Sequence, residues 1–115
     1  MATVRQLLDE HPDITGLVVQ NEPIIGPLLD VLRRLGRRVP DDMSLVAICA
    51  DDVAERQVPQ LSSVSIPAER IGDQAVESLI TKLEGGDVPA LTLLPPALTA
   101  RESSCQAPHR DLTTA

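Results

Sequence analysis

The chain has 115 residues, 43% of them hydrophobic, and its 17 acidic and 10 basic side chains give a formal charge of −7, which is consistent with one domain that has one modest core. The acidic balance and the absence of Phe, Trp and Tyr exclude a basic surface with aromatic platforms for nucleic-acid bases. No secretory signal and no bilayer-spanning apolar run are visible, so we expect a cytoplasmic protein with no membrane contact and with Cys49 and Cys105 as free thiols.

The first part of the chain alternates between helical and strand patterns. A short apolar stripe predicts a helix at residues 3–11, and the apolar run at residues 15–20 predicts a strand that is covered on both faces. Pro23 is typical of a helix start, and apolar residues recur at helical spacing over residues 24–35. Gly36 is a good terminator for this helix.

The alternation continues to residue 100. A second buried strand is predicted at residues 44–49, followed by a short helix at 53–57 and a third strand at 62–66. The longest helix is predicted at residues 67–84, with one apolar side buried. An extended segment at residues 91–100 is interrupted by two prolines, which favours a sheet edge or a crossover. This order predicts the α/β class, with a mostly parallel sheet and flanking helices, and parallel pairing between the first two strands.

Four segments carry motifs that occur together in one protein family. They are GRRVPDDMSLV at Gly36–Val46, PQLSSV at Pro59–Val64, IGDQAV at Ile71–Val76 and LLPPALTARES at Leu93–Ser103. Each motif alone is weak, but in this order they resemble the LacI/GalR family of bacterial transcription regulators over nearly the whole chain.

The resemblance implies the C-terminal part of a sensor that is built like a two-lobed periplasmic sugar-binding protein. Residues 1–61 would form βα units of the C-terminal lobe. Residues 62–102 would supply a crossover strand, a helix of the N-terminal lobe and a returning strand, and residues 103–115 would be a polar tail. The resemblance also implies a regulator and not an enzyme, with a sugar or related metabolite as effector and with no cofactor or metal. DNA would be contacted only through a headpiece outside this chain.

Ligands of open α/β sheets bind beyond the carboxyl ends of the strands. The family places an Asn-Asp pair at the first of these ends and an Asp-Asp pair at the second, where they bind sugar hydroxyls. By register, Gln20 and Asn21 match the first pair, whereas Cys49 falls where the second pair begins and Asp51 comes two residues late. The ligand-binding candidates are therefore Gln20, Asn21, Glu22, Cys49 and Asp51. Helix capping is the alternative role for Asn21 and Asp51.

The resemblance also implies a homodimer, because dimers of the family form largely through the C-terminal lobe. The interface candidates are Ile24, Ile25, Leu28, Val53 and Arg56. Leu29 and Val31 widen the apolar face of the same helix, which predicts a second surface to bury. The apolar side of the long helix would also be exposed in a monomer.

Other interpretations remain open from the sequence. A fragment of a periplasmic sugar-binding transport protein would share the fold, and a small flavodoxin-like enzyme or receiver domain would share the alternation. Cys49 is better explained as a buried, inert thiol than as a nucleophile. The arginines at 33–34 and 37–38 are better explained by the helix dipole than by a phosphate site. We expect the isolated chain to bind effector weakly or not at all, because only one lobe's contacts are present.

Overall fold

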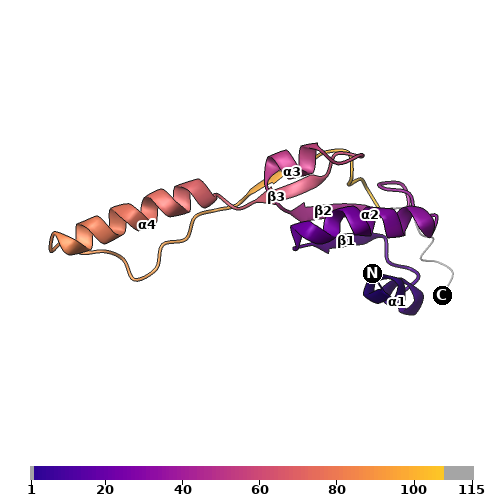
Figure 1. Ribbon diagram of the computed structural model, residues 1–115, viewed down its shortest axis with the longest axis horizontal. Helices are drawn as coiled ribbons and strands as arrows, with labels where there is room; N and C mark the ends of the chain where they lie inside the picture. The colour runs from indigo at the N-terminus through magenta and orange to yellow at the C-terminus, as the bar shows by residue number, and fades with distance from the viewer. Residues whose placement is uncertain (1, 108–115) are drawn as a thin grey trace.

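The computed structural model describes residues 2–107 of the chain (Figure 1). Helices and strands alternate as the sequence predicts. In chain order the elements are α1 (Ala2–Glu10), β1 (Gly16–Val19), the 3-10 turn η1 (Glu22–Ile24), α2 (Ile25–Arg34), β2 (Ser44–Ile48), α3 (Asp51–Glu55), β3 (Ser62–Ser65), α4 (Ala68–Leu83) and β4 (Ala97–Thr99).

The four strands form one sheet in the order β1-β2-β3-β4. β1 pairs with β2 and β2 with β3 in parallel, while β4 lies antiparallel to β3 at the edge. The predicted mostly parallel sheet and the parallel pairing of the first two strands are confirmed. Gly36 ends the α2 segment with a φ of 72°, the left-handed conformation that glycine adopts without strain.

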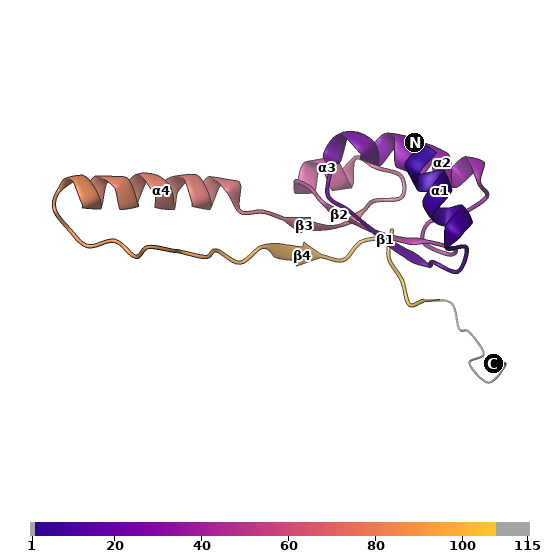
Figure 2. The same cartoon turned by 90° about the horizontal axis from the view of Figure 1, so that it is seen from below.

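The core lies on one face of the sheet, where α1, α2 and α3 all pack (Figure 2). Alternation along the strands directs Leu45 and Ala47 into this core, and both are fully buried. The opposite face has no helix within the described residues, and Val18 is 73% exposed there. The expectation that β1 is covered on both faces is therefore wrong, because the helices that follow β1 and β2 both return to the same side.

The buried side chains of α2 cover more of the helix surface than a single apolar stripe. Leu29 and Val31 are buried in the monomer together with the central apolar stripe of α2, because α1 and the core enclose the helix from two directions. The expected second apolar surface on this helix is therefore absent.

α4 stands away from the body as an arm, and the molecule measures 64 × 33 × 25 Å (Figure 1). Its radius of gyration of 19.3 Å exceeds the value of about 13 Å for a compact domain of this length. No residue of α4 is buried, so the prediction of a buried apolar side is wrong for this chain alone. The sequence pattern is amphipathic, but no described element of the chain covers the helix. The expected exposure of its apolar side in a monomer is confirmed, with Leu79 58% and Leu83 78% exposed.

Several element boundaries differ from the sequence-based ones. The short helix begins at Asp51 instead of residue 53, and of the extended segment at 91–100 only Ala97–Thr99 pairs as a strand. The predicted polar tail begins with a buried residue. Ser103 is fully buried, and its hydroxyl bonds to the backbone of Leu45 in β2 and of Ser62 in β3. Residues 108–115 of that tail lie outside the described residues. No helix in the described part of the chain is long and apolar enough to cross a membrane.

Candidate functional site

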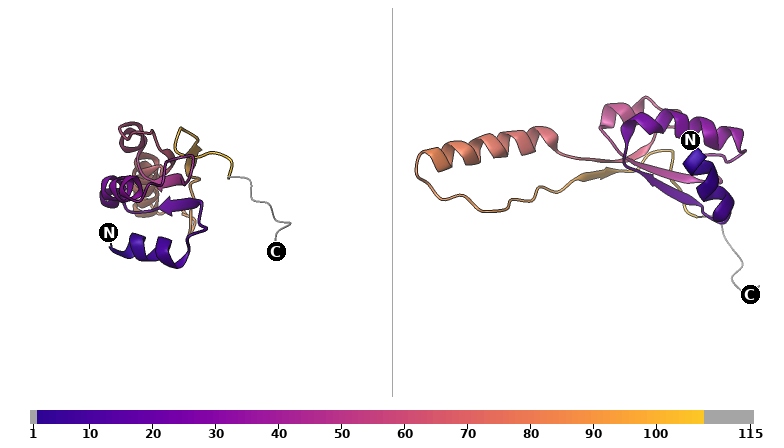
Figure 3. Two further views of the ribbon diagram at one scale, coloured as in Figure 1. Left: turned by 90° about the vertical axis from the view of Figure 1, so that its right-hand side faces the viewer. Right: turned by 60° about the horizontal axis from the view of Figure 1, so that its bottom comes forward.

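A hollow of about 350 Å³ opens at the carboxyl ends of the parallel strands. Because β1 and β2 pair in parallel, the residues that follow them emerge at the same edge of the sheet. β3 ends beside them and leads into α4 (Figure 3). The hollow is lined by Gln20, Glu22, Ile48, Cys49, Ala50, Ile66 and Ala68.

Glu22 joins two walls of this hollow. Its Oε1 accepts a hydrogen bond of 3.0 Å from the backbone N–H of Ala50, which connects the loop after β1 to the loop after β2. Within the described residues, the second carboxylate oxygen makes no hydrogen bond to the protein. A carboxylate oxygen in that state can accept a hydrogen bond from a ligand hydroxyl.

Cys49 forms part of the wall and is only 6% exposed. Burial raises the pKa of its thiol, and the negative charge of Glu22 raises it further, whereas Arg101 opposes the shift. The thiol is therefore protonated at neutral pH, which makes it a poor nucleophile. Both cysteines are free, as the sequence predicts.

The five predicted ligand residues do not all lie together. The structure brings Gln20, Glu22 and Cys49 into one hollow, while Asn21 and Asp51 are exposed beside it. Asn21 makes no side-chain cap bond to η1, and Ala50 rather than Asp51 holds the N-cap position of α3. Capping therefore does not explain either residue.

The carboxylate of Asp51 is instead bound to Arg101, with an Oδ1 to Nη2 distance of 3.0 Å. Sequence reasoning did not assign Arg101 a role, although it lies in the Leu93–Ser103 motif. It also missed Ile66 and Ala68, which follow β3. The predicted strand end at residue 66 was the available signal, since a third parallel strand must end at the same edge.

The interface candidates are also split by the structure. Ile25 and Leu28 are each 2% exposed and belong to the core of the monomer, which corrects their assignment to a contact surface. Ile24 and Val53 are half-buried at its margin, and Arg56 is exposed and paired with Asp52 at 3.1 Å. Helical spacing alone could not separate the core-facing side of α2 from its outer side.

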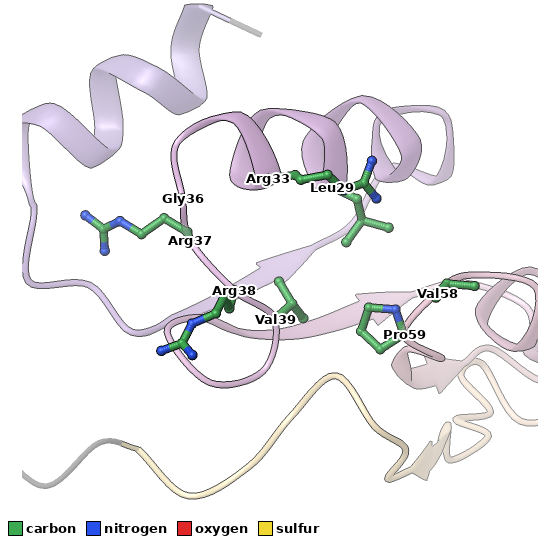
Figure 4. Close-up of a pocket in the computed structure, with 8 residues that line it drawn as sticks. All are labelled: Leu29, Arg33, Gly36, Arg37, Arg38, Val39, Val58 and Pro59. Atoms are coloured by element: carbon green, nitrogen blue, oxygen red, sulfur yellow. The ribbon is translucent and has the colours of Figure 1, made fainter.

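A second hollow of about 270 Å³ lies away from the strand ends, between the end of α2 and the loops at 36–39 and 58–59. Figure 4 shows that Arg33, Arg37 and Arg38 border it with their guanidinium groups directed apart. Arg33 pairs with Asp30 at 3.2 Å, and Arg38 pairs with Asp42 at 2.9 Å. Arg37 instead donates to the backbone carbonyl oxygen of Pro12 at 3.2 Å, so the three arginines do not converge on one anion.

Comparison with known proteins identifies similar domains over nearly the whole chain. A family model described as a periplasmic binding protein-like domain matches residues 1–104. The transcriptional regulator CelR of Thermobifida fusca is 34% identical over 104 residues, which cover 90% of this chain and 31% of that protein. The lactose operon repressor of Rhizobium radiobacter is 31% identical over 97 residues, which cover 84% of each chain. This chain thus spans less than a third of CelR.

Solved structures give the same result. A CelR–cellobiose complex superposes with a TM-score of 0.77 at 33% identity and covers 90% of this chain and 32% of that one. A LacI family regulator from Arthrobacter sp. FB24 in complex with lactose has a TM-score of 0.72 at 32% identity, with coverage of 86% and 38%.

Proposed function

The chain belongs to the periplasmic binding protein-like domain family of LacI-type transcriptional regulators, and we propose that the hollow at its strand ends is one half of an effector site. The observation that supports this role is the convergence of Gln20, Glu22 and Cys49 at the carboxyl ends of parallel strands. The relatives of this chain are transcriptional regulators and not enzymes, which agrees with the expectation of a non-enzymatic chain. The same finding argues against a fragment of a transport protein and against a flavodoxin-like enzyme or receiver domain.

The chemistry of the hollow favours a small polyhydroxylated effector. Glu22 offers a carboxylate oxygen and Gln20 an amide, and both groups bond to hydroxyls. Ile48, Ile66 and Ala68 supply apolar wall but no aromatic ring, since the chain has none. Two of the similar solved structures hold cellobiose and lactose, so these sugars are the first probes to use.

We propose that residues 1–61 form one lobe and that residues 62–102 leave it and return to it. β3 leads out to α4 and β4 leads back antiparallel to β3, so both connections run side by side (Figure 2). Ile66 and Ala68 line the hollow at the start of this excursion. A lobe that docks on the arm would close the hollow from the other side, as in hinge closure around a ligand.

We further propose that the regulator is a cytoplasmic homodimer and that its contacts with DNA lie outside these 115 residues. The charge of −7 does not suit a phosphate-binding surface. Three of the interface candidates are accessible for a dimer contact, namely Ile24, Val53 and Arg56. They form the margin between η1 and α3. Ile25 and Leu28 would support this margin from inside the core.

Saturation-transfer NMR, which detects weak binding, tests the effector proposal. With cellobiose or lactose added to the chain, we expect transfer to sugar protons at an affinity of about 1 mM or weaker. Glu22→Gln should reduce the transfer, and Glu77→Gln on α4, which removes the same charge far from the hollow, should not. Equal transfer in all three proteins would place the sugar elsewhere.

A further inference from the structure

Arg101 is the most extensively bonded side chain near the hollow. The side chain is 10% exposed. Its Nη1 donates to the carbonyl oxygen of Leu61 at 2.8 Å and to Ser63 Oγ at 2.6 Å. Its Nη2 lies 3.0 Å from Asp51 Oδ1 and 3.6 Å from Glu55 Oε1. A nearly buried guanidinium with this many partners has one orientation.

These contacts connect the returning chain to the wall of the hollow. Arg101 follows β4, and its backbone N–H donates to Ser62 Oγ at 2.8 Å, which ties it to β3 as well. Asp51 is the first residue of α3 and follows Cys49 and Ala50, which line the hollow. Arg101 therefore joins the strand that leads out to α4 and the strand that returns from it with the turn at residues 49–51.

We propose that Arg101 is a positioning residue of the effector site, which acts through Asp51 to hold the turn at residues 49–51 in place. In this arrangement the carboxylate of Asp51 is bound to Arg101, and the carboxylate available to a ligand in the hollow is that of Glu22. The inference rests on the proposed function only in naming the hollow an effector site.

The proposal can be tested without an effector, by measuring how well the turn at residues 49–51 covers the Cys49 thiol. In a Cys105→Ser background Cys49 is the one cysteine left, and its reaction with iodoacetamide is followed from about pH 7 to about pH 11. Such a profile separates the pKa of the thiol from the limiting rate of the thiolate. The limiting rate reports how well the turn covers Cys49, whereas the pKa also responds to the charges of Glu22, Arg101, Asp51 and Asp52.

We expect Arg101→Gln to raise the limiting rate about tenfold, the effect of losing hydrogen bonds to a charged group. Asp51→Asn should raise it about threefold, as for a half-exposed ion pair. The double variant should react no faster than Arg101→Gln alone. Asp52→Asn is the matched control, because it removes the same charge from the same helical turn but pairs with Arg56, and it should leave the limiting rate unchanged.

Equal limiting rates in Asp51→Asn and Asp52→Asn would overturn the proposal, as would additive effects of the Arg101 and Asp51 changes. If Arg101→Gln does not fold, the comparison of Asp51→Asn with Asp52→Asn decides alone. Because no sugar is present, failure of the effector proposal would leave these rates as they are.

Discussion

The backbone N–H of Ala50 donates a hydrogen bond of 3.0 Å to Glu22 Oε1, so the loops that follow β1 and β2 are held by a contact across 28 residues of chain. The contact places a carboxylate inside the hollow next to the Cys49 thiol. Glu22 thus both shapes the site and presents an acceptor in it.

Glu22→Ala should lower the free energy of unfolding by about 1 kcal/mol, the usual value of one intramolecular hydrogen bond. Glu22→Gln keeps an oxygen acceptor for Ala50 and should remain within about 0.5 kcal/mol of the parent. Urea unfolding measures both. Equal losses in the two variants would show that charge, and not the hydrogen bond to Ala50, is what matters.

Ser103 should be more important for stability than its place near the end of the chain suggests. Its Oγ accepts the N–H of Ser62 at 2.7 Å and donates to the carbonyl oxygen of Leu45, and the residue is fully buried. Ser103→Ala leaves these buried groups without that partner and should cost about 1–3 kcal/mol in urea unfolding. Ser78→Ala on the exposed arm should cost less than about 0.5 kcal/mol, since alanine favours a helix. A cost for Ser103→Ala no larger than that of the control would contradict this role.

The order of elements and the sheet could be predicted from sequence because β1 and β2 are short apolar runs, the β3 segment alternates, and α2 and α4 carry apolar residues at helical spacing. Which residues are buried could not be predicted, because burial depends on which face of the sheet each connecting helix covers. Val18, for example, belongs to an apolar strand but faces the side that has no helix. Gln20, Glu22 and Cys49 were found from strand ends. The Arg101–Asp51 pair was not, because its members are 50 residues apart and no local pattern joins them.

Acid should weaken the turn at residues 38–42. The hydrogen bonds of Arg38 hold the pKa of Asp42 below its ordinary value of 3.8. A lowered pKa in the folded state stabilises the protein above the ordinary pKa, and this contribution is lost as the pH falls through the lower folded value. The urea midpoints of the parent and Asp42→Asn should therefore differ near pH 6 and converge as the pH falls below 3.8 and through the lower folded pKa.

Asp41→Asn is the matched control for this prediction, since Asp41 lies 4.0 Å from Arg38 in a looser ion pair. It should change the midpoint near pH 6 less than Asp42→Asn does. A difference between the parent and Asp42→Asn that is independent of pH would contradict the assignment.

Light scattering should give a mass near twice 12.3 kDa if the margin between η1 and α3 forms a dimer. Val53→Asp should abolish the doubled mass, because a charge would be buried at the contact. Arg56→Glu, which alters an exposed side chain and leaves the core intact, should weaken it as well. Val18→Asp, on the open face of the sheet, should leave the dimer unchanged. A parent mass of 12.3 kDa, or loss of the dimer only in Val18→Asp, would contradict this interface.

The most direct test of the central claim is to map where a sugar contacts the chain. In a titration of the nitrogen-15-labelled protein with cellobiose or lactose, the account predicts amide shifts at residues 20–22 and 48–51 and at Ile66 and Ala68, with a Kd no tighter than about 1 mM because the facing lobe is not engaged. Shifts confined to the arginine-bordered hollow, or sub-millimolar binding to the isolated chain, would contradict it.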